Sequence, residues 1–79
     1  MSRDEIIQRV MSVLQDALDN DDIVYRDDLT AKDVAEWDSL SNIRLMVAIE
    51  RAFKTKFTAG EWQGLKQLGD LVDMLAARQ

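Results

Sequence analysis

The sequence contains no cysteine, no histidine and no proline, and it has only 3 glycines. Without cysteine there can be neither a disulfide framework nor a thiolate metal site. Without histidine as well, Ser–His and Cys–His nucleophilic catalysis and most transition-metal sites are excluded. The scarcity of proline and glycine permits long helices almost everywhere. We therefore expect a helical protein that has no catalytic residues, is not an enzyme and binds no metal.

The chain also lacks any long apolar run. Its start, Met1-Ser2-Arg3-Asp4-Glu5, is too polar for a secretory signal, and no segment approaches a membrane span. A chain of 79 residues makes one small domain, which buries roughly 60% of the surface that its unfolded form exposes. Its 47% hydrophobic and 32% charged residues are typical of a globular protein. We expect residues 1–79 to form a single domain in the cytoplasm, away from membranes.

The acidic excess is unevenly distributed. Residues 1–38 carry 4 basic and 11 acidic side chains, residues 39–57 carry 4 and 1, and residues 58–79 carry 2 and 3. An overall charge of −5 disfavours nucleic acid as a ligand. The small basic patch in the middle of the chain points instead to a protein partner.

Apolar residues recur at helical spacing in the first part of the chain. Ser2 and Glu5 have the spacing of a capping box, which predicts a helix that runs to about Leu18. The segment from Asp19 to Trp37 is acidic and aperiodic, so we expect a long loop in which Thr30 and Asp33 cap one short helical turn. This loop contains apolar residues that could anchor it to the helices: Ile23, Tyr25, Leu29, Val34 and Trp37.

A second helix is predicted from Ser39 to about Phe53. Its inward stripe consists of Leu45, Met46, Ile49, Ala52 and Phe53, and Ile43 is expected at the edge of that stripe. A different face presents Leu40, Arg44, Val47 and Arg51. Two exposed apolar side chains beside two arginines suggest a docking surface for a partner, although isolated surface Leu and Val residues are common.

Two shorter helices complete the expected fold. Thr58 and Glu61 form a second capping box, while Phe57 and Trp62 stand at the positions of a hydrophobic staple. These signals predict a helix that starts near Ala59 and ends at Gly64 in a left-handed cap. A last helix is expected from about Gln67 to Ala77. The fold class is therefore all-α, a small antiparallel four-helix bundle with a short third helix and a long first loop.

Ser39 is placed where this loop gives way to the second helix. Asp38 and Ser39 are both good cap residues, and the Ser39 hydroxyl should lie on the surface at the positive end of the helix dipole. A phosphate attached there would be tolerated, and the carboxylate of Asp38 would oppose that benefit in part. Because the chain lacks a histidine base, Ser39 is better suited to modification than to catalysis.

The Asp38-Ser39-Leu40 triplet, with its flanking loop and helix, resembles the attachment site of acyl carrier proteins. The likeness is strongest from Trp37 to Phe57, including the pair Ile49-Glu50, and it continues at Gly69-Asp70-Leu71-Val72. It implies the acyl carrier fold along the whole chain. It also implies a 4′-phosphopantetheine arm, derived from coenzyme A and esterified to Ser39, with acyl groups on its thiol.

The resemblance further implies partners. A phosphopantetheinyl transferase would read Asp38 and Leu40 beside the site, and acyl-loading and acyl-processing enzymes would contact Val47. Asp38 favours an acyl carrier over an aminoacyl carrier, because the related peptidyl carriers usually have a Gly-His-Ser-Leu-type site. Ile43, Met46, Trp62 and Leu65 are candidates for a cleft that shelters the acyl chain.

The sequence departs from many fatty-acid carriers in two places. Glu36-Trp37 precede the triplet where such carriers often have a Gly, and Arg44 and Arg51 replace expected acids. We therefore expect a stand-alone, monomeric carrier of a specialised pathway for polyketides, other secondary metabolites or lipids. The alternatives are a housekeeping carrier of fatty-acid synthesis, an unmodified acidic helical adaptor for protein–protein interaction and, most remotely, a small Ser hydrolase.

Overall fold

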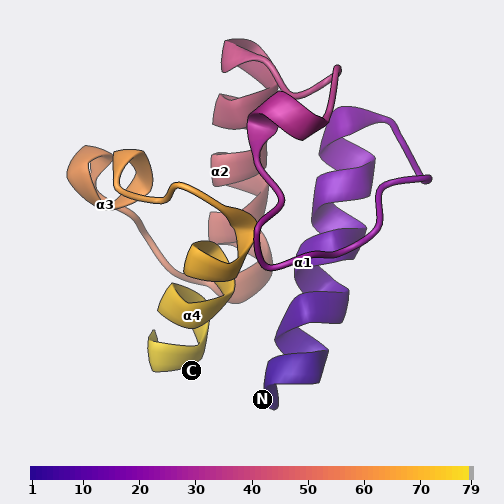
Figure 1. Ribbon diagram of the computed structural model, residues 1–79. Coiled ribbons are helices and arrows are strands. Elements are labelled where there is room, and N and C mark those ends of the chain that lie inside the picture. The colour runs from indigo at the N-terminus through magenta and orange to yellow at the C-terminus, as the bar shows by residue number, and fades with distance from the viewer. Residues whose placement is uncertain (79) are drawn as a thin grey trace.

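The computed structural model describes residues 1–78, which form helices and connecting loops. In chain order these are α1 (Arg3–Leu18), the 3₁₀ turn η1 (Ala31–Asp33), α2 (Ser39–Phe53), α3 (Ala59–Gln63) and α4 (Leu68–Arg78). Helix α1 packs against both α2 and α4 and runs antiparallel to them, while the short α3 stands off to one side (Figure 1). The predicted all-α bundle, with its short third helix and long first loop, is confirmed.

The capping boxes set the helix starts where the sequence predicted them. The Ser2 Oγ accepts a hydrogen bond from the Glu5 backbone N–H at 3.2 Å, and the Glu5 carboxylate accepts one from the Ser2 N–H at 3.1 Å. The same reciprocal pair joins Thr58 and Glu61 at the start of α3. The spacing of these residues therefore decides the helix boundaries through local hydrogen bonding alone.

The core lies between α1, α2 and α4 and also includes side chains from the long loop. Ile23, Leu29 and Val34 are buried in it, and Tyr25 and Trp37 pack against it, so the predicted loop anchors are confirmed. The helices contribute the other buried apolar residues: Ile6, Val10, Met11, Leu14, Leu18, Leu45, Ile49, Phe53, Leu68, Leu71, Val72 and Leu75. The loop is consequently part of the folded unit and holds the start of α2 in place.

Two local predictions were wrong. The Ile43 side chain is 57% exposed and faces away from the core stripe, because its position on the helix turns it toward α3. Gly64 has φ −74 and ψ −13, a right-handed conformation rather than a left-handed cap. The Leu65 N–H bonds to the Trp62 carbonyl at 3.2 Å, so the chain continues in a right-handed turn beyond α3. Among residues 1–78, the left-handed helix ends are Asp19 and Lys54, both at φ 52.

The start of α4 is tied to the long loop by main-chain hydrogen bonds. The Leu68 and Gly69 N–H groups donate to the carbonyls of Leu29 and Asp27, each at 2.8 Å. These bonds satisfy helix-end donors that a local cap would otherwise serve. Because Gly69 is buried and has no side chain, the backbone of Asp27 can lie directly against it.

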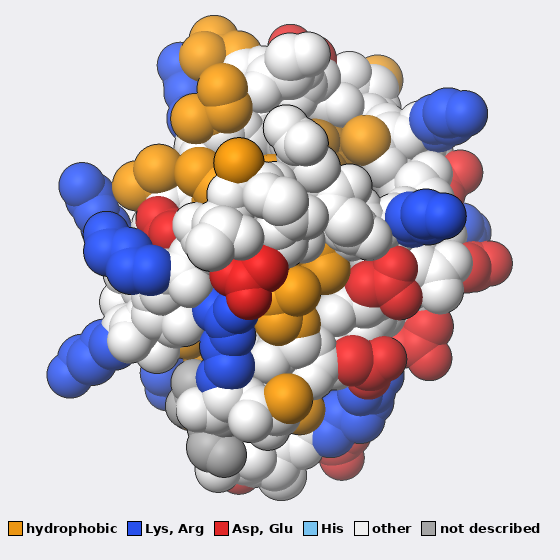
Figure 2. All heavy atoms as spheres, turned by 90° about the vertical axis from the view of Figure 1, so that its left-hand side faces the viewer, with side chains coloured by type: hydrophobic (Ala, Val, Ile, Leu, Met, Phe, Trp, Pro, Cys, Tyr) orange, Lys and Arg blue, Asp and Glu red, His pale blue; other side chains and the backbone are white. Residues whose placement is uncertain are grey.

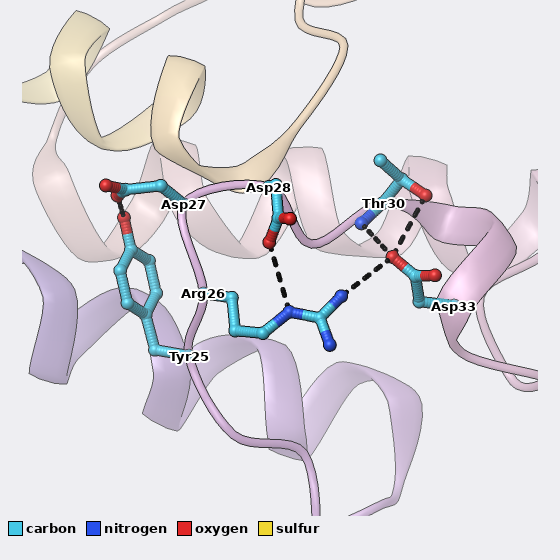
Figure 3. Close-up of polar contacts among 6 residues, drawn as sticks. All are labelled: Tyr25, Arg26, Asp27, Asp28, Thr30 and Asp33. Atoms are coloured by element: carbon cyan, nitrogen blue, oxygen red, sulfur yellow. Dashed lines mark hydrogen bonds and ion pairs between the residues drawn. The ribbon is translucent and has the colours of Figure 1, made fainter.

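Polar side chains brace the outer side of this loop (Figure 3). Arg26 pairs with Asp28 at 3.1 Å and Asp33 at 3.3 Å, and the Tyr25 hydroxyl donates to Asp27. Burial, together with that hydrogen bond to Asp27, raises the pKa of Tyr25 to about 12. None of the helices among residues 1–78 combines the length and the apolar composition needed to cross a bilayer.

Candidate functional site

Ser39 is the first residue of α2 and its side chain is exposed. The helix cap is made by its neighbour: the Asp38 carboxylate accepts the Ser41 N–H at 2.9 Å. This hydrogen bond from the Ser41 backbone holds the pKa of Asp38 below its usual range. Of the two candidate cap residues, Asp38 therefore does the capping, and the Ser39 hydroxyl remains on the surface at the positive end of the helix.

The junction around Ser39 is fixed from both sides. The Trp37 indole Nε1–H donates to the Asn42 Oδ1 at 3.1 Å, which links the end of the loop to the first turn of α2. The Asn20 side chain donates to the Glu36 carboxylate at 3.1 Å and so connects the two ends of the loop. The roles of Asn42 and Asn20 were not predicted from the sequence, because each acts through a partner distant in the chain or on a different element.

The predicted partner residues share the outer side of α2. Leu40 is 60% exposed and Val47 is 37% exposed, and Arg44 and Arg51 are exposed as well. Asp38 caps the same helix at its start. The structure thus places four of the five predicted partner residues on the exposed side of α2, as the helical spacing indicated, and the fifth, Asp38, at the N-cap beside Ser39.

The exposed surface around α2 includes residues that the sequence did not predict for it. Ile43 joins Leu40 and Val47 as a third large apolar side chain exposed on α2. At the far end of the helix, an open hollow of about 580 Å³ is lined by Val47, Glu50, Arg51, Lys54, Thr55 and Lys56. The excess of basic residues in segment 39–57 was the signal that could have pointed to Lys54 and Lys56.

The side chains proposed to shelter an acyl chain fall into two adjoining spaces. Ile43, Met46 and Trp62 line an open hollow of about 340 Å³ between α2 and α3. Trp62 and Leu65 line a more enclosed cavity of about 70 Å³, together with Trp37, Asn42 and buried leucines. The predicted cleft is therefore divided, with Trp62 bordering both spaces.

The chemistry available at this site is limited to the hydroxyl itself. The chain has no histidine, and within residues 1–78 no three His, Cys, Asp or Glu side chains are grouped so that they could hold a metal ion. The Ser39 hydroxyl consequently has no general base beside it of the kind found in serine hydrolases. The site therefore consists of one exposed hydroxyl at the start of a helix whose first turn is held by hydrogen bonds.

Known proteins provide an independent comparison. No family model matches the chain. The chain is 28% identical over 79 residues to an acyl carrier protein from Prochlorococcus marinus, an alignment that covers 100% of this chain and 99% of that protein. It also matches the solution structure of the holo acyl carrier protein from Geobacter metallireducens with a TM-score of 0.84 and 37% identity, covering 90% of this chain and 82% of that one. Sequence and fold therefore agree that the chain belongs to the acyl carrier protein family.

Proposed function

We propose that this chain carries acyl groups as thioesters on a 4′-phosphopantetheine arm attached to Ser39, acting as one domain and as a monomer. Membership of the family gives the chain the general role of an acyl carrier. The observation that supports attachment at Ser39 is its exposed hydroxyl at the first position of α2, where the cap is supplied by Asp38. The chain itself contributes no catalytic residue.

The residues around Ser39 fit such a group. A phosphodiester on the Ser39 oxygen would lie at the positive end of a 15-residue helix, which favours negative charge, while Asp38 offsets part of that gain. In the attachment step the Ser39 oxygen would form a bond to the pantetheine phosphorus of coenzyme A. The pyrophosphate P–O bond would break, and adenosine 3′,5′-bisphosphate would leave. The transferase accepts the hydroxyl proton and supplies any metal. When bound, the group supplies the thiol that holds the acyl chain.

The main task of the folded chain is to hold the attachment point rigidly. The Asp38 cap and the Trp37–Asn42 hydrogen bond fix the residues on both sides of Ser39. A rigid base and a flexible arm raise the effective concentration of the acyl group at a docked enzyme's active site. Because the arm is the same whichever enzyme it serves, the protein surface around Ser39 must determine which enzymes dock.

A short acyl group could find shelter beside Trp62. The enclosed cavity of about 70 Å³ is roughly half as large as the cavity of about 150 Å³ that holds one benzene in another protein. A longer chain would have to extend into the open hollow between α2 and α3 or displace α3. Helix α3 comprises 5 residues and stands apart from the bundle (Figure 1), which makes it the element that such a chain would displace.

The pathway is best proposed as a specialised one, for a polyketide, another secondary metabolite or a lipid. Arg44 and Arg51 would repel an enzyme whose docking patch is basic, since like charges across an interface reduce affinity and association rate. A fatty-acid-synthesis transferase with such a basic patch should therefore acylate this carrier slowly. The substitutions Arg44→Glu and Arg51→Glu together should accelerate it. Fast acylation of the unaltered protein would favour the housekeeping fatty-acid carrier instead.

Attachment is tested by intact-mass measurement. The purified protein is incubated with coenzyme A and a broad-specificity phosphopantetheinyl transferase, and the mass should increase by one arm. Ser39→Ala should abolish the increase. Ser41→Ala is the matched control, because it keeps the backbone N–H that donates to the Asp38 carboxylate, and it should be modified as the unaltered protein is.

The alternative of a different class is an unmodified helical adaptor, which would use the Leu40 and Val47 surface and leave Ser39 without a role. An unchanged mass under conditions that modify a known carrier would favour the adaptor. An added arm that persists in Ser39→Ala would place the attachment elsewhere in the chain.

A further inference from the structure

Positive charge is concentrated on α2 and the turn that follows it. Residues 39–57 carry 4 basic and 1 acidic side chain, whereas the rest of the chain carries 6 and 14. The single acid, Glu50, is half-buried and accepts the Phe57 N–H at 2.9 Å. The four cations are exposed, and within residues 1–78 none of them forms an ion pair: Arg44, Arg51, Lys54 and Lys56.

Exposed apolar side chains accompany these cations. Of the 5 large hydrophobic residues that are exposed among residues 1–78, Leu40, Ile43 and Val47 all lie on α2. Figure 2 shows hydrophobic side chains at the upper left beside several Lys and Arg side chains, and most Asp and Glu side chains on the right, where further Lys and Arg side chains also lie. We call these three apolar residues and the four cations the cationic α2 face. Apolar surface rimmed by charge is typical of interaction sites.

The far end of this face is concave. Lys54 ends α2 in a left-handed conformation at φ 52, which turns the chain around the helix end. The hollow of about 580 Å³ that results has Val47 and Glu50 in its wall and three cations around it, Arg51, Lys54 and Lys56. Such a hollow can receive a protruding carboxylate side chain, which would find several ammonium and guanidinium donors there.

Building on the proposed carrier function, we propose that the cationic α2 face docks on an acidic patch of the acyl-processing enzymes, whose carboxylates enter the hollow at the end of α2. Residue 54 lies 15 positions after Ser39, which at the rise of an α-helix is about 22 Å along the axis. The acidic patch of the enzyme should therefore lie about that far from the entrance through which the arm reaches its active site.

The rest of the carrier is mainly acidic, and this charge asymmetry orients the carrier as it approaches an enzyme. An acidic enzyme attracts the cationic α2 face and repels the other sides of the carrier, so the two molecules approach with Ser39 already facing the enzyme. Pairs of this kind are exposed and individually weak. Weak pairs allow the fast release that a shuttling carrier requires.

An anionic bilayer would offer the same negative charge, but this face suits a protein better. Helices that lie on membranes have a broad apolar face, commonly with aromatic residues. The cationic α2 face has only Leu40, Ile43 and Val47, with no aromatic side chain, and its cationic end is concave. The face therefore lacks the broad apolar surface with which such helices enter a bilayer.

The test is an amide chemical-shift titration of the ¹⁵N-labelled protein with three probes. The first is a helical peptide with alternating Glu and Leu faces, the second is its Lys counterpart, and the third consists of vesicles of phosphatidylcholine and phosphatidylserine. The Glu peptide should shift amides between Leu40 and Lys56, and the effect should weaken at high salt. Arg51→Glu with Lys56→Glu should weaken its binding roughly tenfold.

The matched control is Lys32→Glu with Lys66→Glu, two exposed residues outside α2 and the turn that follows it. This pair changes the net charge equally and should alter the affinity less than about twofold. The proposal would be overturned if both double substitutions weakened binding of the Glu peptide equally. It would also be overturned if the protein bound the vesicles but not the Glu peptide. Modification of Ser39 is measured in the same variants. An added arm without acidic-peptide binding would refute the docking surface alone, whereas an unmodified Ser39 would refute the carrier function.

Discussion

Gly69→Ala should destabilise the protein, although alanine is the better helix former. Alanine is favoured over glycine in a helix by at most about 1 kcal/mol. At Gly69, however, an added Cβ would lie 2.9 Å from the Asp27 carbonyl oxygen and 3.2 Å from the Asp27 Cα, both main-chain atoms. Such overpacking typically costs about 1–3 kcal/mol. Moving the loop away would also weaken the 2.8 Å hydrogen bond from the Gly69 N–H to Asp27.

These terms give a net loss of about 1–2 kcal/mol in the free energy of unfolding. Gly60→Ala is the matched control, because no atom lies within 4 Å of a Cβ built on Gly60 in α3. That substitution should be neutral or stabilise by up to about 1 kcal/mol. Urea unfolding followed by circular dichroism measures both variants, and the m-values should remain unchanged. If Gly69→Ala proved as stable as Gly60→Ala, the close approach of the loop to α4 would be refuted.

Two further perturbations test other contacts of the fold. The pKa of Tyr25 is raised from 10.0 to about 12, so the stability that its neutral form contributes below pH 10 should be lost as the pH rises toward 12. The difference in urea midpoint between the unaltered protein and Tyr25→Phe should shrink over that interval, and a constant difference would contradict the assignment. Arg78 pairs with Glu61, donates to the Lys56 carbonyl at 2.7 Å and lies 5.1 Å from the centroid of the Phe57 ring. Arg78→Ala should therefore accelerate hydrogen exchange in α3 more than in α1, and equal acceleration in both helices would show that Arg78 does not hold α3 specifically.

The parts of the fold that sequence alone predicted are those that local rules control. The Ser2–Glu5 and Thr58–Glu61 boxes specify helix starts within four consecutive residues, and the apolar periodicity identifies the buried side of each long helix. Residues that depend on distant neighbours were harder to predict. The close approach of the Asp27 backbone to Gly69 was not predicted, because it joins segments that are far apart in the chain.

In the candidate site, too, the features set by local spacing were predicted and those set by distant contacts were not. The side of α2 that carries Leu40, Arg44, Val47 and Arg51 followed from helical spacing, and its exposure is confirmed. The outward turn of Ile43 and the concave end beyond Lys54 did not follow, because both depend on how α3 and the turn before it lie beside α2. The roles of Ser39 and its neighbours in attachment and docking remain predictions for the experiments above.

The walls of the small cavity include both tryptophans of the chain, Trp37 and Trp62. Indole fluorescence depends on the polarity and packing of its surroundings, so the unlabelled protein contains its own optical reporter at this place. Any guest that displaces water there, or any movement of α3 away from the bundle, should alter the colour and intensity of the emitted light. Acyl chains of increasing length could thus be compared in solution without attaching a dye.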